Sequence, residues 1–177
     1  AIFRALYRFK VHHSKIRTHL LPKETGRLKI VHISDLHLGS FNFRYHILER
    51  AVKIINHIEP DLILFTGDLV NNFAWELKGW SEVLQKLEAK YGKYAVLGNH
   101  DYGDYSSWKT KELKQKNFES IKYFYRKIDF RLLLNESEIL AFKDSKLGII
   151  GVENWGHPPF PQHGDLNKAL KDLSDTD

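Results

Sequence analysis

Three apolar stretches of this chain each end in side chains that can bind a metal ion. In order along the chain, these side chains belong to Asp35, His37, Asp68, Asn99, His100 and Asp101. Oxygen and nitrogen donors of these types, with no sulfur among them, suit Mn²⁺, Fe or Zn²⁺. A single Asp-x-His pair is common in proteins, but three such groups in order predict a metal site.

The spacing of these groups indicates the elements that must position them. Intervals of 33 and 31 residues separate Asp35, Asp68 and Asn99. Each interval is long enough for a crossover helix that leads into the next parallel strand. Because sites in α/β sheets form at the carboxyl ends of strands, we expect the three groups to meet at one edge of a sheet. Gly67 is expected to make the turn that brings Asp68 to this edge.

Hydrophobic periodicity and turn residues predict the individual elements. We expect strands over residues 28–34, 61–66, 94–97, 130–134, 138–142 and 147–152. We expect helices over 44–58, 76–90, 108–127 and 166–173, with Gly92 capping the second. Turns are expected at 135–136 and 144–145, and loops at 101–107 and 156–164. At the start of the chain, we expect a short helix, or the end of a longer one, over 2–7 and a strand over 7–11, antiparallel to 28–34.

The composition limits the class of protein. With 177 residues and 42% hydrophobic side chains, the chain is large enough for one domain with a packed core. It contains no cysteine, which excludes disulfides and thiolate metal ligands. Its apolar runs are shorter than the roughly 20 residues that span a bilayer.

Positive charge is concentrated at the start of the chain. Residues 1–29 contain eight Lys or Arg residues and one acidic residue, Glu24, whereas acidic residues slightly outnumber basic ones in the remainder. A basic segment of this kind fits a juxtamembrane position beside anionic lipid, and it fits equally a solvated edge strand. The slightly acidic body argues against long nucleic acids as partners.

Three motifs resemble those of a known enzyme family. Asp35-x-His37, Gly67-Asp68 and Gly98-Asn-His-Asp101 resemble the first three motifs of the calcineurin-like metallophosphoesterases, and the resemblance extends from about Leu28 onward. Segments at 98–104, 132–136, 151–156 and 164–169 resemble a bacterial membrane-associated subgroup, the UDP-2,3-diacylglucosamine hydrolase-like phosphodiesterases. The implied fold is α/β, with two packed β-sheets between outer helices in four layers.

The same resemblance implies that the chain is the first part of a longer domain. Residues 1–27 are interpreted as a basic lead-in strand near a membrane, and residues 28–177 as the N-terminal portion of a metallophosphoesterase domain. The family completes its site with a later histidine and a Gly-His-x-His segment, and this sequence contains no Gly-His-x-His. We therefore expect further ligands and strands beyond residue 177, and expect the 177 residues alone to be an incomplete enzyme.

The resemblance also implies how the metal ligands act. Asp35, His37 and Asp68 hold one divalent ion, Asp68 bridges to a second, and Asn99 binds the second ion through its amide oxygen. The two ions are Mn, Fe or Zn. A metal-activated hydroxide then attacks a phosphodiester or pyrophosphate.

Two further residues are given catalytic roles by the resemblance. His100 faces the substrate, where it protonates the leaving oxygen or stabilises phosphoryl charge, and Asp101 orients its imidazole. Glu153, Asn154 and Trp155 follow a predicted strand, and they either line the substrate pocket or serve only in packing.

Several alternatives remain open at the level of the sequence. A broad phosphomonoesterase or a nuclease would use the same site, and a non-catalytic domain for membrane or protein association would use the same fold. Within the subgroup, the substrate is expected to be lipid-linked or a nucleotide-sugar, and the protein to be membrane-associated on a side that the sequence does not specify. Five histidines lack the ligand spacing of the main motifs and are interpreted as non-ligands, namely His12, His13, His19, His157 and His163.

Overall fold

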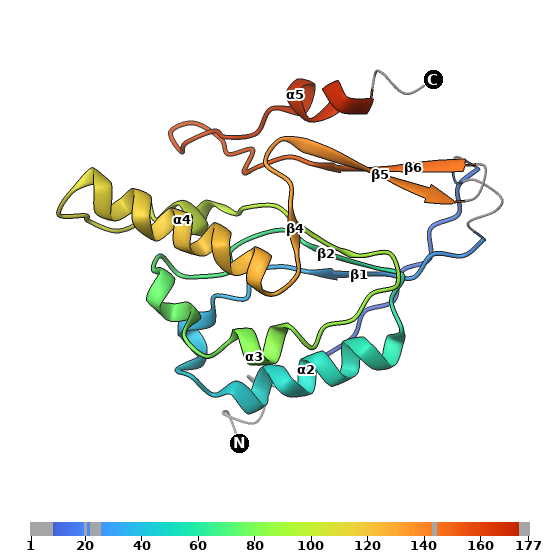
Figure 1. Ribbon diagram of the computed structural model, residues 1–177, viewed down its shortest axis with the longest axis horizontal. Coiled ribbons are helices and arrows are strands. Elements are labelled where there is room, and N and C mark those ends of the chain that lie inside the picture. Colours follow the sequence, from blue (N-terminus) through green and yellow to red (C-terminus); the bar gives the residue numbers. More distant parts are fainter. Residues whose placement is uncertain (1–8, 20, 22–25, 143–144, 174–177) are drawn as a thin grey trace.

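Four parallel strands form the sheet that positions the three polar groups. The computed structural model describes residues 9–19, 21, 26–142 and 145–173, and Figure 1 shows the sheet among the other elements. In spatial order its strands are β1 (Ile30–Ile33), β2 (Leu62–Phe65), β3 (Lys93–Ala95) and β4 (Arg131–Leu132). All three pairings are parallel, so the carboxyl ends of the strands lie along one edge. This confirms the predicted arrangement of the first three strands.

The central strand β2 is buried on both of its faces. Ile63 and Phe65 lie in the larger apolar core, which they share with α2 (Tyr45–Ile58), α3 (Ser81–Leu84) and α4 (Lys111–Lys127). Leu62 lies in a smaller cluster against which Leu140 and Ile149 of a second sheet pack. A strand buried on both faces needs an apolar side chain at every position, which explains its continuous apolar sequence.

A β-hairpin and a C-terminal helix complete the layers. The hairpin pairs β5 (Glu136–Phe142) with β6 (Ser145–Gly151) in antiparallel register. The helix α5 (Leu166–Leu170) continues into the 3₁₀ turn η5 (Lys171–Leu173), and it contacts both strands of the hairpin. In Figure 1 the layers follow from bottom to top as α2 and α3, the parallel sheet, the hairpin and α5, with α4 to the left of the sheet. The predicted α/β fold is confirmed.

The helix predicted over 76–90 is wrong. The chain forms a 3₁₀ turn η3 (Ala74–Leu77) and the single short helix α3, with Gly79 between them at a φ of 76°. A left-handed residue interrupts the helical hydrogen bonds, and glycine adopts this conformation without steric cost. Trp80 is fully buried, so the apolar spacing identified the side that faces the core but not the break. Gly92 precedes β3 and does not cap a helix.

The start of the chain does not add a strand to the sheet. Residues 9–11 of the predicted strand have no strand structure, and residues 7–8 lie outside the described residues, as does the helix predicted over 2–7. Within the described part of the chain, β1 pairs only with β2 and forms the edge of the sheet. Residues 9–19 are all exposed, and none of their side chains belongs to the buried apolar core that would favour strand pairing.

Most other boundaries agree with the predictions to within a few residues. The helices predicted over 44–58 and 166–173 and the strands over 138–142 and 147–152 are confirmed. The helix α4 begins at Lys111 and not at 108, because the Thr110 hydroxyl accepts a hydrogen bond from the N–H of Leu113 and caps it. Only two residues of the strand predicted over 130–134 form β4.

The turns around the hairpin are described only in part. Asn135 lies in the left-handed region, with a φ of 55°, which confirms a turn at this position. Glu136, which was predicted to belong to the same turn, is the first residue of β5. The second predicted turn includes Asp144, which lies outside the described residues.

Candidate metal centre

The turn after β1 holds Asp35 and His37 in unusual backbone conformations. Their φ values are 53° and 44°, in the left-handed region that residues other than glycine rarely adopt. Such conformations cost on the order of 1–3 kcal/mol each and persist only when the surroundings enforce them. Here the N–H groups of Asp35 and His37 donate, each at 3.0 Å, to the carbonyl oxygens of Gly67 and Asp68. The 3₁₀ turn η2 (Leu38–Phe41) follows. Strain held in this way is typical of a functional site.

The turn after β2 presents Asp68 at the edge of the sheet, as predicted. Gly67 has a φ of 91° and Asp68 itself a φ of 56°. The Asp68 side chain is largely buried, and its Oδ1 accepts a hydrogen bond from the N–H of His100 at 2.9 Å. Its Oδ2 lies 3.8 Å from Nε2 of His37. The two carboxylate oxygens therefore face two different turns of the site.

Gly98 makes room for the carboxylate of Asp68, and this predicts the effect of filling that room. A Cβ at Gly98 would lie 2.2 Å from Oδ1 of Asp68, although the φ of −91° is one that alanine adopts freely. We expect Gly98→Ala to displace the carboxylate and to weaken metal binding about 10–100-fold, the range typical of changes beside a metal ligand. Metal titration of the full-length protein measures this effect.

The matched control for this variant is Gly148→Ala. The nearest atoms to a Cβ at Gly148 belong to the flexible side chain of Leu173, at 3.2 Å, and Gly148 lies in the hairpin. This control should bind metal as the unmodified protein does. Equal metal affinity in both variants would contradict the close approach of Gly98 to Asp68.

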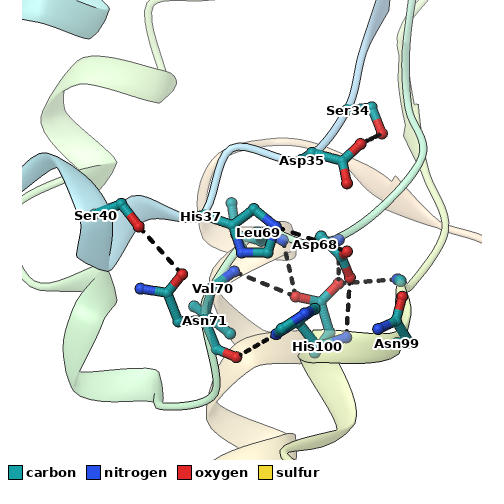
Figure 2. A network of polar contacts seen from close by, with 12 residues as sticks. Ser34, Asp35, His37, Ser40, Asp68, Leu69, Val70, Asn71, Asn99 and His100 are labelled. Atoms are coloured by element: carbon teal, nitrogen blue, oxygen red, sulfur yellow. Dashed lines mark hydrogen bonds and ion pairs between the residues drawn. The ribbon is translucent and has the colours of Figure 1, made fainter. Parts of the chain in front are cut away.

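The third polar group lies on a 3₁₀ turn after β3, η4 (Asn99–Tyr102). One ring nitrogen each of His37 and His100 and one carboxylate oxygen of Asp68 all lie within 4.8 Å of one another. Figure 2 shows the side chains of Asp35 and Asn99 in the same region. Of the four predicted ligands, His37 and Asp68 belong to this group, whereas Asp35 and Asn99 lie with Asp68 in the lining of the adjoining cleft. His100 lies close enough to be considered as a further ligand.

An open cleft of about 510 Å³ lies beside this group. The residues that line it include, among others, Asp35, Asp68, Asn99, Glu153, Asn154 and Trp155. The last three therefore lie at the pocket, an alternative that the sequence had left open. The lining has three acidic side chains and, among the residues the structure describes, no Lys or Arg. A phosphate ester would be repelled by this surface unless cations bind there.

The imidazole of His100 is held by a backbone carbonyl and by two neighbouring rings. Its Nδ1 lies 2.6 Å from the carbonyl oxygen of Asn71. Figure 2 marks this hydrogen bond with a dashed line. A carbonyl oxygen can only accept, so Nδ1 must carry the proton of this hydrogen bond. The ring centroid lies 4.8 Å from that of His37 and 4.7 Å from that of Tyr105. The nitrogen left for chemistry is therefore Nε2.

The Tyr105 hydroxyl also orients the side chain of Asn99. The amide Nδ2 of Asn99 donates to the hydroxyl oxygen of Tyr105 at 2.9 Å. With its nitrogen engaged in this way, the amide presents its oxygen as the remaining polar atom. An amide oxygen is the donor that the predicted role of Asn99 as a metal ligand requires.

Asp101 does not orient the imidazole of His100, contrary to the prediction. It is fully buried, and its carboxylate accepts hydrogen bonds from the tyrosine hydroxyl of Tyr125 and from four backbone N–H groups, those of Asp68, Leu69, Val70 and Gly98. Burial raises the pKa of the Asp101 carboxyl to about 7, against the opposing effect of the N–H groups. The physical reason is geometric, because the carboxylate points inward beneath the turn while the imidazole bonds to Asn71.

The five histidines interpreted as non-ligands lie apart from the group of His37, Asp68 and His100. Four of them, His12, His13, His19 and His157, are exposed. His163 is half-buried and stacks on Tyr102, with ring centroids 3.8 Å apart and planes 8° from parallel. In the described part of the chain, none of the five joins the group of possible ligands.

Three residues in or next to the site could not be recognised from the sequence, namely Asn71, Glu76 and Tyr105. Asn71 acts through its backbone carbonyl, and every residue has this group, so the residue type does not indicate the role. Glu76 was assigned to the predicted helix over 76–90, and this hid the contacts of its carboxylate with the preceding loop. For Tyr105, the only signal was its place in the predicted loop over 101–107 beside the site.

A parallel sheet that gathers Asp, His and Asn side chains at its carboxyl edge defines a metal-binding α/β domain. The family model of the calcineurin-like phosphoesterases matches residues 28–175. The chain belongs to this family. The superfamily predicted from the three motifs is thereby confirmed, and the family is metal-dependent.

Curated proteins from distant organisms are similar to the chain. It is 37% identical over 100 residues to the uncharacterized metallophosphoesterase YkuE of Bacillus subtilis, covering 55% of the chain and 35% of that protein. It is 36% identical over 149 residues to an uncharacterized metallophosphoesterase of Aquifex aeolicus, covering 84% and 50%. It is 34% identical over 101 residues to a transmembrane protein with metallophosphoesterase domain of Danio rerio, covering 56% and 23%. The chain spans half or less of the length of these relatives.

Proposed function

We propose that the full-length protein hydrolyses phosphoesters at a dinuclear metal site with Asp35, His37, Asp68 and Asn99 as ligands. The observation that best supports this is the position of Asp68, which lines the cleft and also belongs to the group with His37 and His100. Its two carboxylate oxygens face different partners, and this fits a bridge between two ions. The set of oxygen and nitrogen donors suits Mn²⁺, Fe or Zn²⁺.

In this mechanism the metal ions activate the nucleophile, and side chains of the protein act on the leaving group. Two divalent ions supply an activated water nucleophile and withdraw charge from the phosphoryl oxygens. The carbonyl of Asn71 holds one ring proton on Nδ1 of His100. The imidazolium would carry its second proton on Nε2, and this is the proton that would pass to the leaving oxygen. The Tyr105 ring packs against the imidazole and limits its motion.

The cleft supports an ester with an organic group on each side of the phosphorus, or a pyrophosphate. Its volume of about 510 Å³ is within the range of small-molecule sites and exceeds the needs of a phosphate alone. Val152, Trp155 and Leu166 give part of its lining an apolar character, and Trp155 is 58% exposed. We therefore propose a lipid-linked or nucleotide-sugar substrate, as the resemblance to the UDP-2,3-diacylglucosamine hydrolase-like subgroup implies.

A comparison of two chromogenic substrates tests this function. The full-length protein, stripped of metal and then supplied with Mn²⁺, should hydrolyse bis(p-nitrophenyl) phosphate faster than p-nitrophenyl phosphate. The stripped protein should hydrolyse neither. A preference for the monoester would favour the phosphomonoesterase alternative, and no turnover with Mn²⁺, Fe²⁺ or Zn²⁺ would favour a non-catalytic domain.

We also propose that the protein works beside a membrane. The Danio rerio relative is named a transmembrane protein, and that name concerns the relative alone. In this chain, Ile16 is 86% exposed between the exposed basic residues Lys15 and Arg17, a combination that suits an anionic lipid surface. No helix in the described residues is long and apolar enough to cross a bilayer. Sedimentation of the full-length protein with phosphatidylserine vesicles, but not with phosphatidylcholine vesicles, is the expected result.

A further inference from the structure

Six consecutive backbone N–H groups of the loop after β2 donate to two buried carboxylates. Asp101 accepts the first three, from Asp68, Leu69 and Val70, at 3.0, 2.9 and 3.4 Å. Glu76 accepts the next three, from Asn71, Asn72 and Phe73, at 2.7, 3.0 and 2.8 Å. The two side chains together fix the path of the loop over residues 68–73.

The site that holds Glu76 is built for its carboxylate. The residue is only 2% exposed, and a Cβ at Gly39 would lie 2.3 Å from its Oε2, so that the chain packs closely around the charge. Among the ion pairs of the described residues, none involves Glu76. A buried carboxylate without a cation must be stabilised by hydrogen bonds, and the three N–H groups supply these.

The loop that Glu76 holds is the one that holds His100. Oε2 of Glu76 accepts the N–H of Asn71, and the carbonyl oxygen of the same residue lies 2.6 Å from Nδ1 of His100. From the other side, Asn117 of α4 accepts the N–H of Ala74 and donates to the carbonyl of Asn72. The position of the Asn71 carbonyl is therefore set by side chains that do not touch the cleft.

We propose that Glu76 is a positioning residue for His100, acting through the backbone of Asn71. By fixing this carbonyl, Glu76 keeps the imidazole proton on Nδ1 and leaves Nε2 directed toward the substrate. The proposal rests on the proposed function for its kinetic consequence, but the state of the imidazole is independent of it. Both can therefore be measured separately.

The test uses Glu76→Gln in the full-length protein. Glutamine has the same shape but only one acceptor oxygen, so it cannot satisfy three N–H groups and instead turns an NH₂ group toward at least one of them. In the metal-free protein, long-range ¹H–¹⁵N spectra of the histidine rings should show His100 protonated at Nδ1. In Glu76→Gln, this signal should be replaced by a mixture of the two ring tautomers.

The kinetic arm uses the same variant loaded with Mn²⁺. We expect kcat for bis(p-nitrophenyl) phosphate to fall about 10–100-fold, which is typical when a residue that orients an active-site side chain is removed. KM and metal content should stay unchanged, because no ligand is altered. Glu82→Gln is the matched control, since Glu82 lies on α3, is exposed, and loses the same charge.

Each outcome decides for or against the proposal. A Glu76→Gln protein that keeps both the Nδ1 proton and its kcat would overturn it, as would an equal loss in Glu82→Gln. If Glu76→Gln does not fold, hydrogen exchange in the unmodified protein decides, because the amides of residues 71–73 should be as protected as those of 68–70. Rapid exchange at 71–73 would overturn the proposal. If the unmodified protein hydrolyses no phosphoester, the proposed function fails, while the ring spectra still decide the role of Glu76.

Discussion

Asp68→Asn is expected to remove both metal binding and hydrolysis. Asp68 offers Oδ1 toward the turn after β3 and Oδ2 toward His37, so that one substitution changes both sides of the site. An asparagine loses the negative charge, and it places an NH₂ group where one carboxylate oxygen would hold a metal ion in the proposed site. We expect metal content to fall at both positions and turnover to drop by more than about 10²-fold, beyond the cost of altering an outer partner of a ligand. Elemental analysis and phosphodiester turnover measure the two effects.

The control for Asp68→Asn is Asp129→Asn. Asp129 also lies in the left-handed region, with a φ of 61° against 56° for Asp68, and asparagine tolerates this conformation well. Its side chain is 93% exposed, and its ion-pair partner Lys93 lies at the start of β3, whereas the site lies after the end of that strand, so that the control removes the same charge without altering the site. The control should keep both metal ions and normal turnover. Two full equivalents of metal in Asp68→Asn would refute the bridging role.

His100→Ala is expected to lower kcat by about 10²–10⁴, the usual contribution of a general acid, while both metal ions stay bound. The reason is the hydrogen bond from Nδ1 to the carbonyl of Asn71, which engages one ring proton, so that the second proton of the imidazolium sits on Nε2 and can pass to the leaving oxygen. The loss should be larger for esters with poor leaving groups than for p-nitrophenyl esters, because a good leaving group departs without a proton. Turnover across a series of aryl esters measures this dependence.

The proximity of His100 to His37 and Asp68 makes metal ligation the rival role for this imidazole. Elemental analysis of His100→Ala separates the two roles, because a ligand would take one equivalent of metal with it. His46→Ala is the control, since His46 is exposed on α2. A loss of one equivalent in His100→Ala alone would make His100 a ligand, and a loss of activity that is equal for all leaving groups would argue against an acid.

The sequence predicted the strands of the site because their signal is local. An apolar stretch followed by a polar turn identifies each strand end, and the interval to the next one is set by the length of a crossover helix. The sequence alone therefore places Asp35, Asp68 and Asn99 at one edge of a parallel sheet, without information on tertiary contacts. The break at Gly79 was missed because the apolar spacing continues through it, and only the left-handed φ of 76° separates η3 from α3.

By itself, the sequence determined which side chains meet at the sheet edge, since strand order and side-chain type follow from patterns within about 30 residues. Only the tertiary structure decided how they are held. Asp101 turned out to bind backbone N–H groups of the loop after β2, and His100 to bind the carbonyl of Asn71. Backbone groups are the same in every residue, so their partners depend on how distant segments approach one another. That approach, at contacts such as Gly98 against Asp68, is fixed by packing in three dimensions and has no local signature.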